Sequence, residues 1–354
     1  MTGTAAQSAP RGSNGPDSDL ECMGRCPVCH SGSRGLRYNN LRDWLFQSSA
    51  SAWTMHECTE CRAHYLDPRP TRAAIGRYYA NYYTHSNAGE EPDGIAGDGS
   101  WFVRTYGVDW MERLGIKAPE FRERGDRWVI SLASSMRHAL RGRCRHRGPP
   151  WPGARLLDMG CGNGHWLPVA QAMGWDAYGM EPDPEAVAVA EKLGRPVQQG
   201  GLPQTGWPDG SFTSVTLNHV IEHLHDQVNA LREIYRILEP GGWVWITTPN
   251  TDSFSHGRFG QHWRGLEPPR HLVVFNTQSL RYLLHNTGFL SCEWTPPNDL
   301  TDWYVRSSGA IAKTAGSKSE RPSRLRMITA TIKSRLCRGA GEELCVLGYK
   351  DSRR

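Results

Sequence analysis

The sequence predicts an α/β fold built on a parallel β-sheet, preceded by a small metal-binding domain. From residue 153 onward, short apolar runs alternate with segments of helical periodicity, which is the pattern of repeated β–α–β units. The first apolar run leads directly into three glycines spaced two residues apart, Gly160, Gly162 and Gly164. Nearer the N-terminus, two Cys-x-x-Cys pairs favour a metal site over a disulfide framework.

Length and composition limit the classes of protein that need be considered. A chain of 354 residues favours two domains, and a net charge of +5 does not by itself indicate a nucleic-acid partner. No apolar run reaches the ~18 residues of a membrane-spanning helix. The polar, Gly/Ser/Pro-rich start of the chain predicts a disordered leader over 1–20 rather than a signal peptide. Together with the cysteine usage, this favours a reducing cytoplasm.

The cysteine pairs predict a zinc-ribbon-like domain over 21–85. Two sulfurs on each of two tight turns would complete a closed tetrahedral thiolate cage, and a closed cage indicates structural rather than catalytic zinc. The expected ligands are Cys26, Cys29, Cys58 and Cys61. Nearby side chains that could replace one of them are Cys22, His30, His56 and His64. Reduced cysteines without metal are the alternative.

A helix, a linker and a domain boundary are expected next. Thr71 is placed to cap a helix that runs through Ile75 to Tyr79. Residues 86–150 are expected to be a linker and a helical segment, and Pro149-Pro150-Trp151-Pro152 marks the start of the larger domain, 151–354.

The larger domain can be divided into its elements in order. The expected strands are 155–159, 177–180, 196–199, 212–218 and 243–248. The expected helices run through Trp166 to Met173, over 185–193, and through Leu231 to Leu238. The tail predicts a basic amphipathic helix over 325–336 and a last strand over 342–349. Such a helix could touch an anionic membrane surface, with a solvated or packed helix as the alternative.

A series of motifs in this domain resembles a known family. The motifs are Asp158–Gly164, Glu181-Pro182-Asp183, Val220–Leu224, Leu238–Gly242, Thr248-Pro249-Asn250 and Pro269–Leu272. They are similar in kind and order to those of class I S-adenosylmethionine-dependent methyltransferases, in particular the ubiquinone-biosynthesis-like group. The resemblance covers about 153–290 and implies a Rossmann-like sheet with helices on both faces.

The resemblance also implies where S-adenosylmethionine would bind. Asp158 would place negative charge near the cationic cofactor, the glycines would let the backbone approach it, and Glu181 would accept hydrogen bonds from the ribose hydroxyls. The implied cofactor-binding residues are Asp158, Gly160, Gly162, Gly164, Glu181, Pro182, Leu202, Asn218 and His219.

Three histidines are candidates for a catalytic base, because a hydroxyl acceptor must lose a proton. They are His219, His223 and His271. Each also has a structural alternative: contacting the cofactor, orienting the helix after the fourth strand, and pinning a loop, respectively. In ubiquinone O-methyltransferases the positions of His219, Glu222 and His223 bind a divalent metal, so a second metal site there stays open.

The segment 251–275 is expected to bind the acceptor. Its candidate substrate-binding residues are Trp263, Arg264, Arg270 and His271. The arginines would suit an anionic acceptor, although Arg270 could instead pair with Glu267, and Trp263 could be a packing residue.

The predicted function is methyl transfer from S-adenosylmethionine to a small-molecule acceptor, with a hydroxyl of a sugar or secondary metabolite favoured. An RNA methyltransferase that docks through the zinc domain is one alternative, and a non-catalytic binding protein of the same fold is another. Nucleic acid is therefore not the favoured partner. The sequence does not distinguish O-, N- and C-methylation, and it gives no oligomeric state.

Overall fold

The structure is a computed structural model that describes residues 19–79, 149–295, 300–317, 322–337 and 339–352. The expected leader lies almost wholly outside these residues, and so does the expected linker and helical segment over 86–150.

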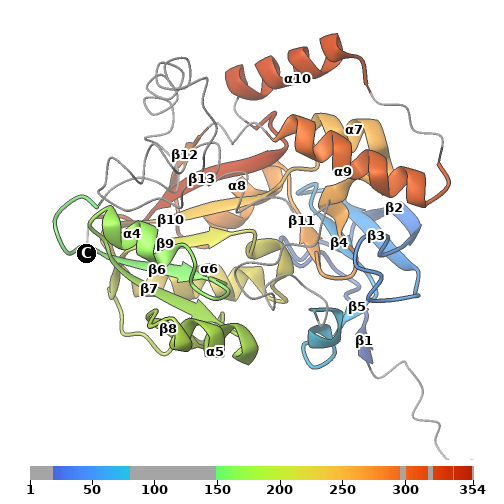
Figure 1. The fold of residues 1–354 in the computed structure, drawn as a ribbon. Coiled ribbons are helices and arrows are strands. Elements are labelled where there is room, and N and C mark those ends of the chain that lie inside the picture. The colour runs from blue at the N-terminus through green and yellow to red at the C-terminus, as the bar shows by residue number, and fades with distance from the viewer. Residues whose placement is uncertain (1–18, 80–148, 296–299, 318–321, 338, 353–354) are drawn as a thin grey trace, which may run out of the picture.

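A seven-stranded sheet forms the centre of the larger domain (Figure 1). Its strands, in spatial order, are β12 (Ser291–Trp294), β13 (Glu343–Tyr349), β10 (Leu238–Pro249), β9 (Phe212–Asn218), β6 (Arg155–Met159), β7 (Asp176–Glu181) and β8 (Val197–Gln199). The five strands from β10 to β8 are parallel, and β13 is antiparallel to both of its neighbours. The strand order reverses between β6 and its neighbours β7 and β9, which is where such sheets bind ligands.

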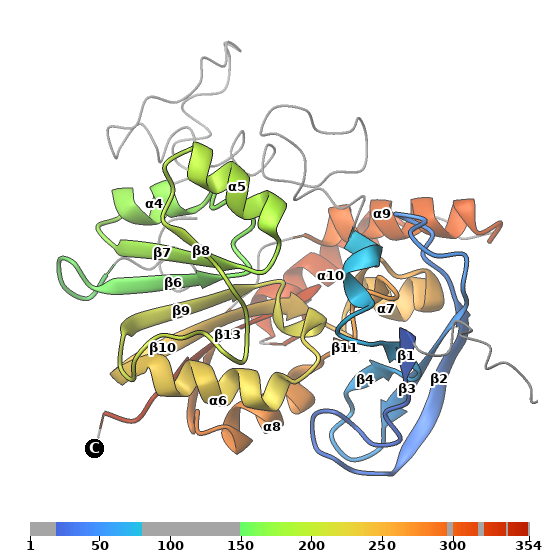
Figure 2. The same cartoon turned by 90° about the horizontal axis from the view of Figure 1, so that it is seen from below.

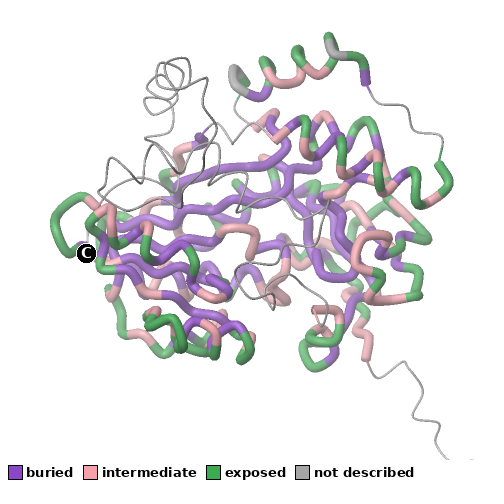
Figure 3. Tube along the Cα trace, viewed as in Figure 1, coloured by how far each residue is buried: buried purple, intermediate pink, exposed green. Residues whose placement is uncertain are grey.

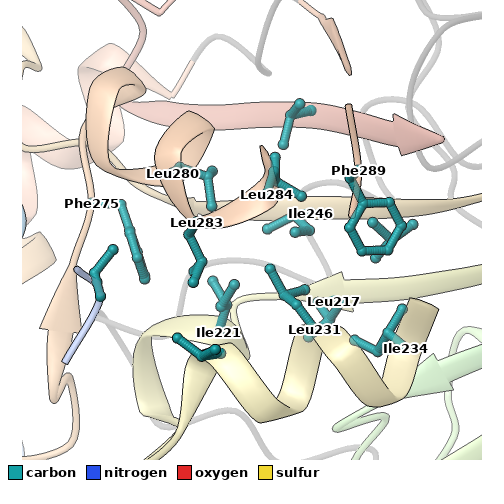
Figure 4. Packing of buried hydrophobic residues seen from close by; sticks show 14 of the residues in the cluster. Leu217, Ile221, Leu231, Ile234, Ile246, Phe275, Leu280, Leu283, Leu284 and Phe289 are labelled. Atoms are coloured by element: carbon teal, nitrogen blue, oxygen red, sulfur yellow. The ribbon is translucent and has the colours of Figure 1, made fainter. Parts of the chain in front are cut away.

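Helices cover both faces of this sheet (Figure 2). The helices α4 (Leu167–Ala172) and α5 (Pro184–Lys192) lie on one side, while α6 (Gln227–Ile237) and α8 (Thr277–Asn286) lie on the other. Figure 4 shows aliphatic side chains of α6 and α8 meeting those of the strands, and Figure 3 shows the strands buried along their length. Apolar burial of this extent is the main stabilising term in folding. The Rossmann-like sheet with helices on both faces is confirmed.

The N-terminal domain is built on a smaller sheet that includes a strand from the larger domain. Its strand order is β11 (Val273–Val274), β4 (His64–Leu66), β3 (Trp53–Cys58) and β2 (Arg34–Leu41). A separate two-stranded pair joins β1 (Leu20–Glu21) to β5 (Arg69–Pro70), and the 3₁₀ turn η2 (Ile75–Tyr79) follows. Because β11 pairs with β4, the two domains share a sheet and are not independent units.

The remaining elements lie between the two sheets and at the C-terminus. They are η5 (Ile221–His223), α7 (Phe254–Phe259), η6 (Gly260–His262), η7 (Arg264–Leu266), α9 (Thr301–Thr314) and α10 (Arg324–Leu336). Among the described residues, no helix has the length and apolarity needed to cross a membrane.

Most element boundaries agree with the predictions. The first and fourth strands of the larger domain match residue for residue, and the last strand begins one residue later than expected. The helix expected after Thr71 is only the 3₁₀ turn η2. The helix expected to include Leu238 ends at Ile237, because Leu238 already pairs with Phe212 in the sheet.

Candidate active site

The turn after β6 has a backbone that only glycine adopts without strain. Gly160, Gly162 and Gly164 have φ values of +62°, +57° and +70°. A Cβ atom on Gly160 would lie 2.7 Å from Val220 Cγ2, and one on Gly164 would lie 2.8 Å from Val197 Cγ2. Both the dihedral angles and the space around these two positions therefore exclude a side chain.

Glu181 ends β7 beside this turn and holds it in place. Its Oε2 atom accepts a hydrogen bond from the Gly162 N–H at 2.8 Å, and Oε1 accepts one from the Asp183 N–H at 3.1 Å. Burial raises the pKa of this carboxyl, partly offset by the two backbone donors. Each carboxylate oxygen has a further lone pair, so Glu181 can still accept from a ligand hydroxyl.

The other implied cofactor-binding residues lie at the same edge of the sheet. Asp158, in β6, accepts a 2.5 Å hydrogen bond from the Thr216 hydroxyl. Pro182 is exposed directly after β7, Leu202 is half-buried in the loop after β8, and Asn218 is half-buried at the end of β9. The strand ends thus gather the expected set around the glycine turn.

His219 is half-buried and lies between two buried carboxylates. Its Nδ1 atom is 3.2 Å from Glu222 Oε1, and its Nε2 atom is 3.0 Å from Glu343 Oε1. Burial alone would lower the pKa of His219, but Glu343 and Glu222 outweigh it and raise the pKa to about 10. A histidine that stays protonated at neutral pH cannot remove a proton. These contacts disfavour His219 as the base, and Glu343 is a partner that the sequence did not indicate.

His223 and His271 form a neutral pair instead. Their ring centroids lie 4.7 Å apart with the planes at 74°. The Nδ1 atom of His223 is 3.1 Å from the Arg270 carbonyl oxygen, and that of His271 is 2.8 Å from the Gly265 carbonyl oxygen. A carbonyl only accepts, so the Nδ1 of His271 carries the hydrogen and its Nε2 keeps a lone pair. The Nδ1 of His223 also lies 2.9 Å from the Tyr79 hydroxyl, which can donate or accept. When this Nδ1 donates to the Arg270 carbonyl, the Nε2 of His223 keeps a lone pair as well.

Burial sets the protonation state of this pair. It lowers the pKa of His223 below its ordinary value and lowers the pKa of His271 to about 4, so both rings are neutral at pH 7. Glu222, His223 and His271 each offer one donor atom within 4.8 Å of the others. This trio differs from the metal set considered in the sequence, because His271 takes the place of His219.

Arg270 does not face a ligand. The side chain is fully buried, its two terminal nitrogens each lie 3.0 Å from a carboxylate oxygen of Asp43, and its Nε donates to Glu267 Oε1 at 3.0 Å. Arg264 also pairs with Glu267. The expected two-point contact of Arg270 with an acceptor is replaced by one with Asp43 of the N-terminal domain.

Trp263 is likewise a packing residue in this structure. It is 2% exposed and stacks against Tyr304 with ring centroids 6.0 Å apart. Of the four residues expected to bind the acceptor, His271 has its side-chain ring against a candidate base, and Arg270 contacts the same base through its backbone carbonyl.

The buried ion pairs of Arg270 with Asp43 and Glu267 predict a large effect of Arg270 on stability. Arg270→Met would leave the buried carboxylates of Asp43 and Glu267 without their shared cation, so we expect the free energy of unfolding to fall by about 3–5 kcal/mol. Urea denaturation measures this change.

Arg306→Met is the matched control for that variant. Arg306 pairs with Asp302 at 2.8 Å, but its side chain is 64% exposed. Loss of an exposed pair should change the free energy of unfolding by at most about 1 kcal/mol. Equal losses in the two variants would show that the Arg270 cluster does not stabilise the fold.

The four cysteines of the N-terminal domain come together as expected. Their sulfur atoms lie within 4.8 Å of one another, with Cys26 and Cys61 3.5 Å apart and Cys29 and Cys58 3.4 Å apart. The side chains expected to substitute for them are not in this cluster.

The two cysteine turns have the same backbone geometry. Each pair is followed by a residue with positive φ, His30 at 59° and Arg62 at 67°. In each, the first cysteine's N–H donates to the residue five positions later, and its carbonyl accepts from the residue four positions later. Two equivalent turns that bring four sulfurs together fit a tetrahedral metal site.

Comparison with known proteins finds similarity over the segment that carries the glycine turn. A family model described as a methyltransferase domain matches residues 127–290. This segment of the chain is similar to that family. The match includes the glycine turn, Glu181, His219 and His223.

Curated relatives resemble the same part of the chain. A probable S-adenosylmethionine-dependent methyltransferase of Mycolicibacterium smegmatis is 33% identical over 139 residues, which is 39% of this chain and 52% of that protein. A ubiquinone biosynthesis O-methyltransferase of Xanthomonas campestris is 33% identical over 106 residues, or 28% of this chain and 44% of its own length. The chain thus spans about half the length of the curated relatives it matches.

Solved structures also align with this chain. A possible histamine N-methyltransferase of Thermotoga maritima has 19% identity and a TM-score of 0.39, covering 64% of this chain and 98% of that one. Phosphoethanolamine N-methyltransferase 2 of Haemonchus contortus, in complex with S-adenosylmethionine, has 20% identity and a TM-score of 0.39, covering 74% of this chain and 61% of that one.

Proposed function

We propose that this protein is an S-adenosylmethionine-dependent methyltransferase that acts on a hydroxyl group of a small molecule, such as a sugar or a secondary metabolite. The observation that carries the proposal is the glycine turn after β6, closed onto the Glu181 carboxylate at the reversal of strand order. The relatives that match the same segment, a probable S-adenosylmethionine-dependent methyltransferase and a ubiquinone biosynthesis O-methyltransferase, support it.

The residues at this edge fit the cofactor. When bound, S-adenosylmethionine supplies a methyl group on a positively charged sulfur. Asp158 and Glu181 provide negative charge and acceptor oxygens, and the turn from Gly160 to Gly164 leaves backbone uncovered by side chains. Pro182, Leu202 and Asn218 would contact the nucleoside from the neighbouring strand ends.

His223 is the proposed base. Its Nε2 lone pair would take the proton of the acceptor hydroxyl as the methyl group passes to the hydroxyl oxygen. The bond that breaks would be the one between the methyl carbon and the sulfur, which would leave as a neutral thioether. The contacts of Nδ1 with the Arg270 carbonyl and the Tyr79 hydroxyl would hold the ring orientation, and donation to the carbonyl would leave the lone pair on Nε2. His271 lies beside His223 and is neutral at pH 7, so it does not repel the positive charge that His223 gains with the proton. Direct displacement demands alignment, so most of the protein's contribution would be positioning.

Binding of S-adenosylhomocysteine to the full chain tests the proposal. Isothermal titration calorimetry should show saturable binding with one site, and the product should raise the melting temperature. Absence of both heat and thermal shift would contradict the assignment. A screen of hydroxylated sugars and phenols for methylated product, read by mass spectrometry, then tests the acceptor class.

Zinc at Cys26, Cys29, Cys58 and Cys61 is proposed to be structural, because all four positions of a tetrahedral ion would be filled by sulfur. We expect about one zinc per chain, released when a mercurial reagent blocks the thiols. A metal-sensitive dye measures the release, and Cys58→Ser should abolish it.

Cys337→Ser is the control for that experiment, since Cys337 is exposed and lies outside the cluster. The zinc content of this variant should equal that of the wild type. Equal zinc loss in both variants, or no zinc in either, would contradict the assigned ligands.

A further inference from the structure

The face that helix α10 (Arg324–Leu336) turns to the protein consists of Met327 and the small residues Ala330, Thr331 and Ser334. Met327 packs against the cluster that contains Trp263 and Tyr304, and Ser334 is only 5% exposed. Surface helices normally direct their apolar stripe inward, so this helix has the opposite orientation.

Three aliphatic side chains of the helix are exposed to solvent. Leu325, Ile328 and Ile332 are 71%, 55% and 49% exposed. Their spacing of three and four residues places them on one face of the helix, opposite Met327 and Ser334. Figure 1 shows α10 at the outer edge of the molecule beyond α9, and Figure 3 shows exposed residues along it. A contiguous exposed aliphatic stripe indicates an interaction surface.

The charge around the stripe has a single sign. The helix sequence RLRMITATIKSRL contains four basic residues and no acidic one, and no Asp or Glu occurs from residue 321 to residue 341. Arg326 and Lys333 are exposed beside the stripe. An aliphatic face bordered by Lys and Arg is the composition of helices that lie in the plane of an anionic membrane interface.

We propose that α10 binds flat on an anionic phospholipid surface, with Leu325, Ile328 and Ile332 inserted among the acyl chains and the basic residues against the headgroups. A second copy of this chain would bring like charges together at the same surface, which disfavours self-association. A nucleic acid would match the charge but would leave the three aliphatic side chains in water.

The helix is linked closely to the edge of the sheet that carries the candidate active site. Asn250, just after β10, donates from Nδ2 to the carbonyl oxygens of Gly339 and Gly341, at 2.8 Å each. Two residues after Gly341, Glu343 begins β13 and contacts His219. The membrane-binding helix would therefore be separated by only a few residues from the segment that contacts the carboxyl ends of the strands. The binding itself does not depend on the proposed methyl transfer.

Vesicle sedimentation of the full chain tests the proposal. The protein should sediment with phosphatidylglycerol vesicles at low salt and should bind phosphatidylcholine vesicles at least about tenfold more weakly. Ile328→Glu combined with Ile332→Glu should weaken binding to the anionic vesicles at least about tenfold, because it removes two inserted side chains and adds repulsion.

Leu290→Glu is the matched control, since Leu290 is 75% exposed on a different part of the surface. This variant should bind like the wild type. Three outcomes would overturn the proposal. The first is equal binding to both lipids, and the second is unchanged vesicle binding of the double variant. The third is a wild-type dimer, measured by light scattering, that the double variant loses while its vesicle binding is retained. None of these results depends on cofactor or acceptor, so failure here leaves the proposed function standing.

Discussion

Gly160→Ala is expected to weaken S-adenosylhomocysteine binding by at least about 100-fold, or about 2.8 kcal/mol. The new Cβ would lie 2.7 Å from Val220 Cγ2, on a residue whose φ is +62°. Relief of this contact requires the turn to move. The same turn contains the Gly162 N–H, which donates a hydrogen bond to Glu181. The loss of affinity should be measured by calorimetry on the full chain.

Gly194→Ala separates this steric effect from simple backbone strain. Gly194 also has a positive φ, +64°, but a Cβ there would meet no atom within 4 Å. Both variants bear the cost of a left-handed alanine, roughly 1–2 kcal/mol of stability. We expect Gly194→Ala to bind the product like the wild type. If the two variants lost affinity equally, the glycine turn would not be the cofactor site.

The periodic parts of the larger domain were predictable from sequence because their signals are local. The strands 155–159 and 212–218 are short segments rich in apolar or β-branched residues and bounded by turn residues, and the structure has them with the same bounds. The sequence predicts a turn at Glu239–Gly242 before the strand, whereas in the structure Leu238 pairs first and pairing resumes at Trp243 in a shifted register. A boundary of this kind depends on the neighbouring strand, which a local pattern does not reveal.

The candidate site could be predicted only where one segment carries it. The glycine turn follows β6, Glu181 ends the neighbouring strand β7, and the spacing between the two is recognisable in the sequence. The partners of the polar residues come from far along the chain instead: Arg270 meets Asp43 across 227 residues, and His219 meets Glu343. A sequence motif identifies His219 and Arg270 as polar residues near the site, but only tertiary packing decides that both are already paired.

The shared sheet is a further feature without a local signal. The strand β11 has two residues, Val273 and Val274, too few for any periodicity, yet it joins the zinc-ribbon-like domain to the acceptor segment. It begins two residues after His271. His271 is therefore connected through a continuous sheet to Cys58, the cysteine of the four-sulfur cluster that ends β3.

His223→Gln is expected to lower kcat by about 10²–10⁴-fold with the acceptor that the screen identifies, while leaving S-adenosylhomocysteine affinity and melting temperature near those of the wild type. Glutamine has no basic nitrogen but can still donate to the Arg270 carbonyl, so the loop should keep its position. His285→Gln changes an exposed histidine and should leave kcat unchanged. If His223→Gln retained wild-type kcat, the base would have to be another group.

The pH dependence of the same reaction distinguishes a base from a purely structural histidine. Only neutral His223 can take the hydroxyl proton, and burial lowers its pKa below the ordinary 6.5. As the pH falls, kcat/KM should therefore stay constant through 6.5 and decline only below it, where the imidazole gains its proton. His223→Gln should lack this acid limb, because the group that titrates is gone. A structural histidine would lower the rate at every pH without removing the limb, and a limb above pH 6.5 would assign the proton transfer elsewhere.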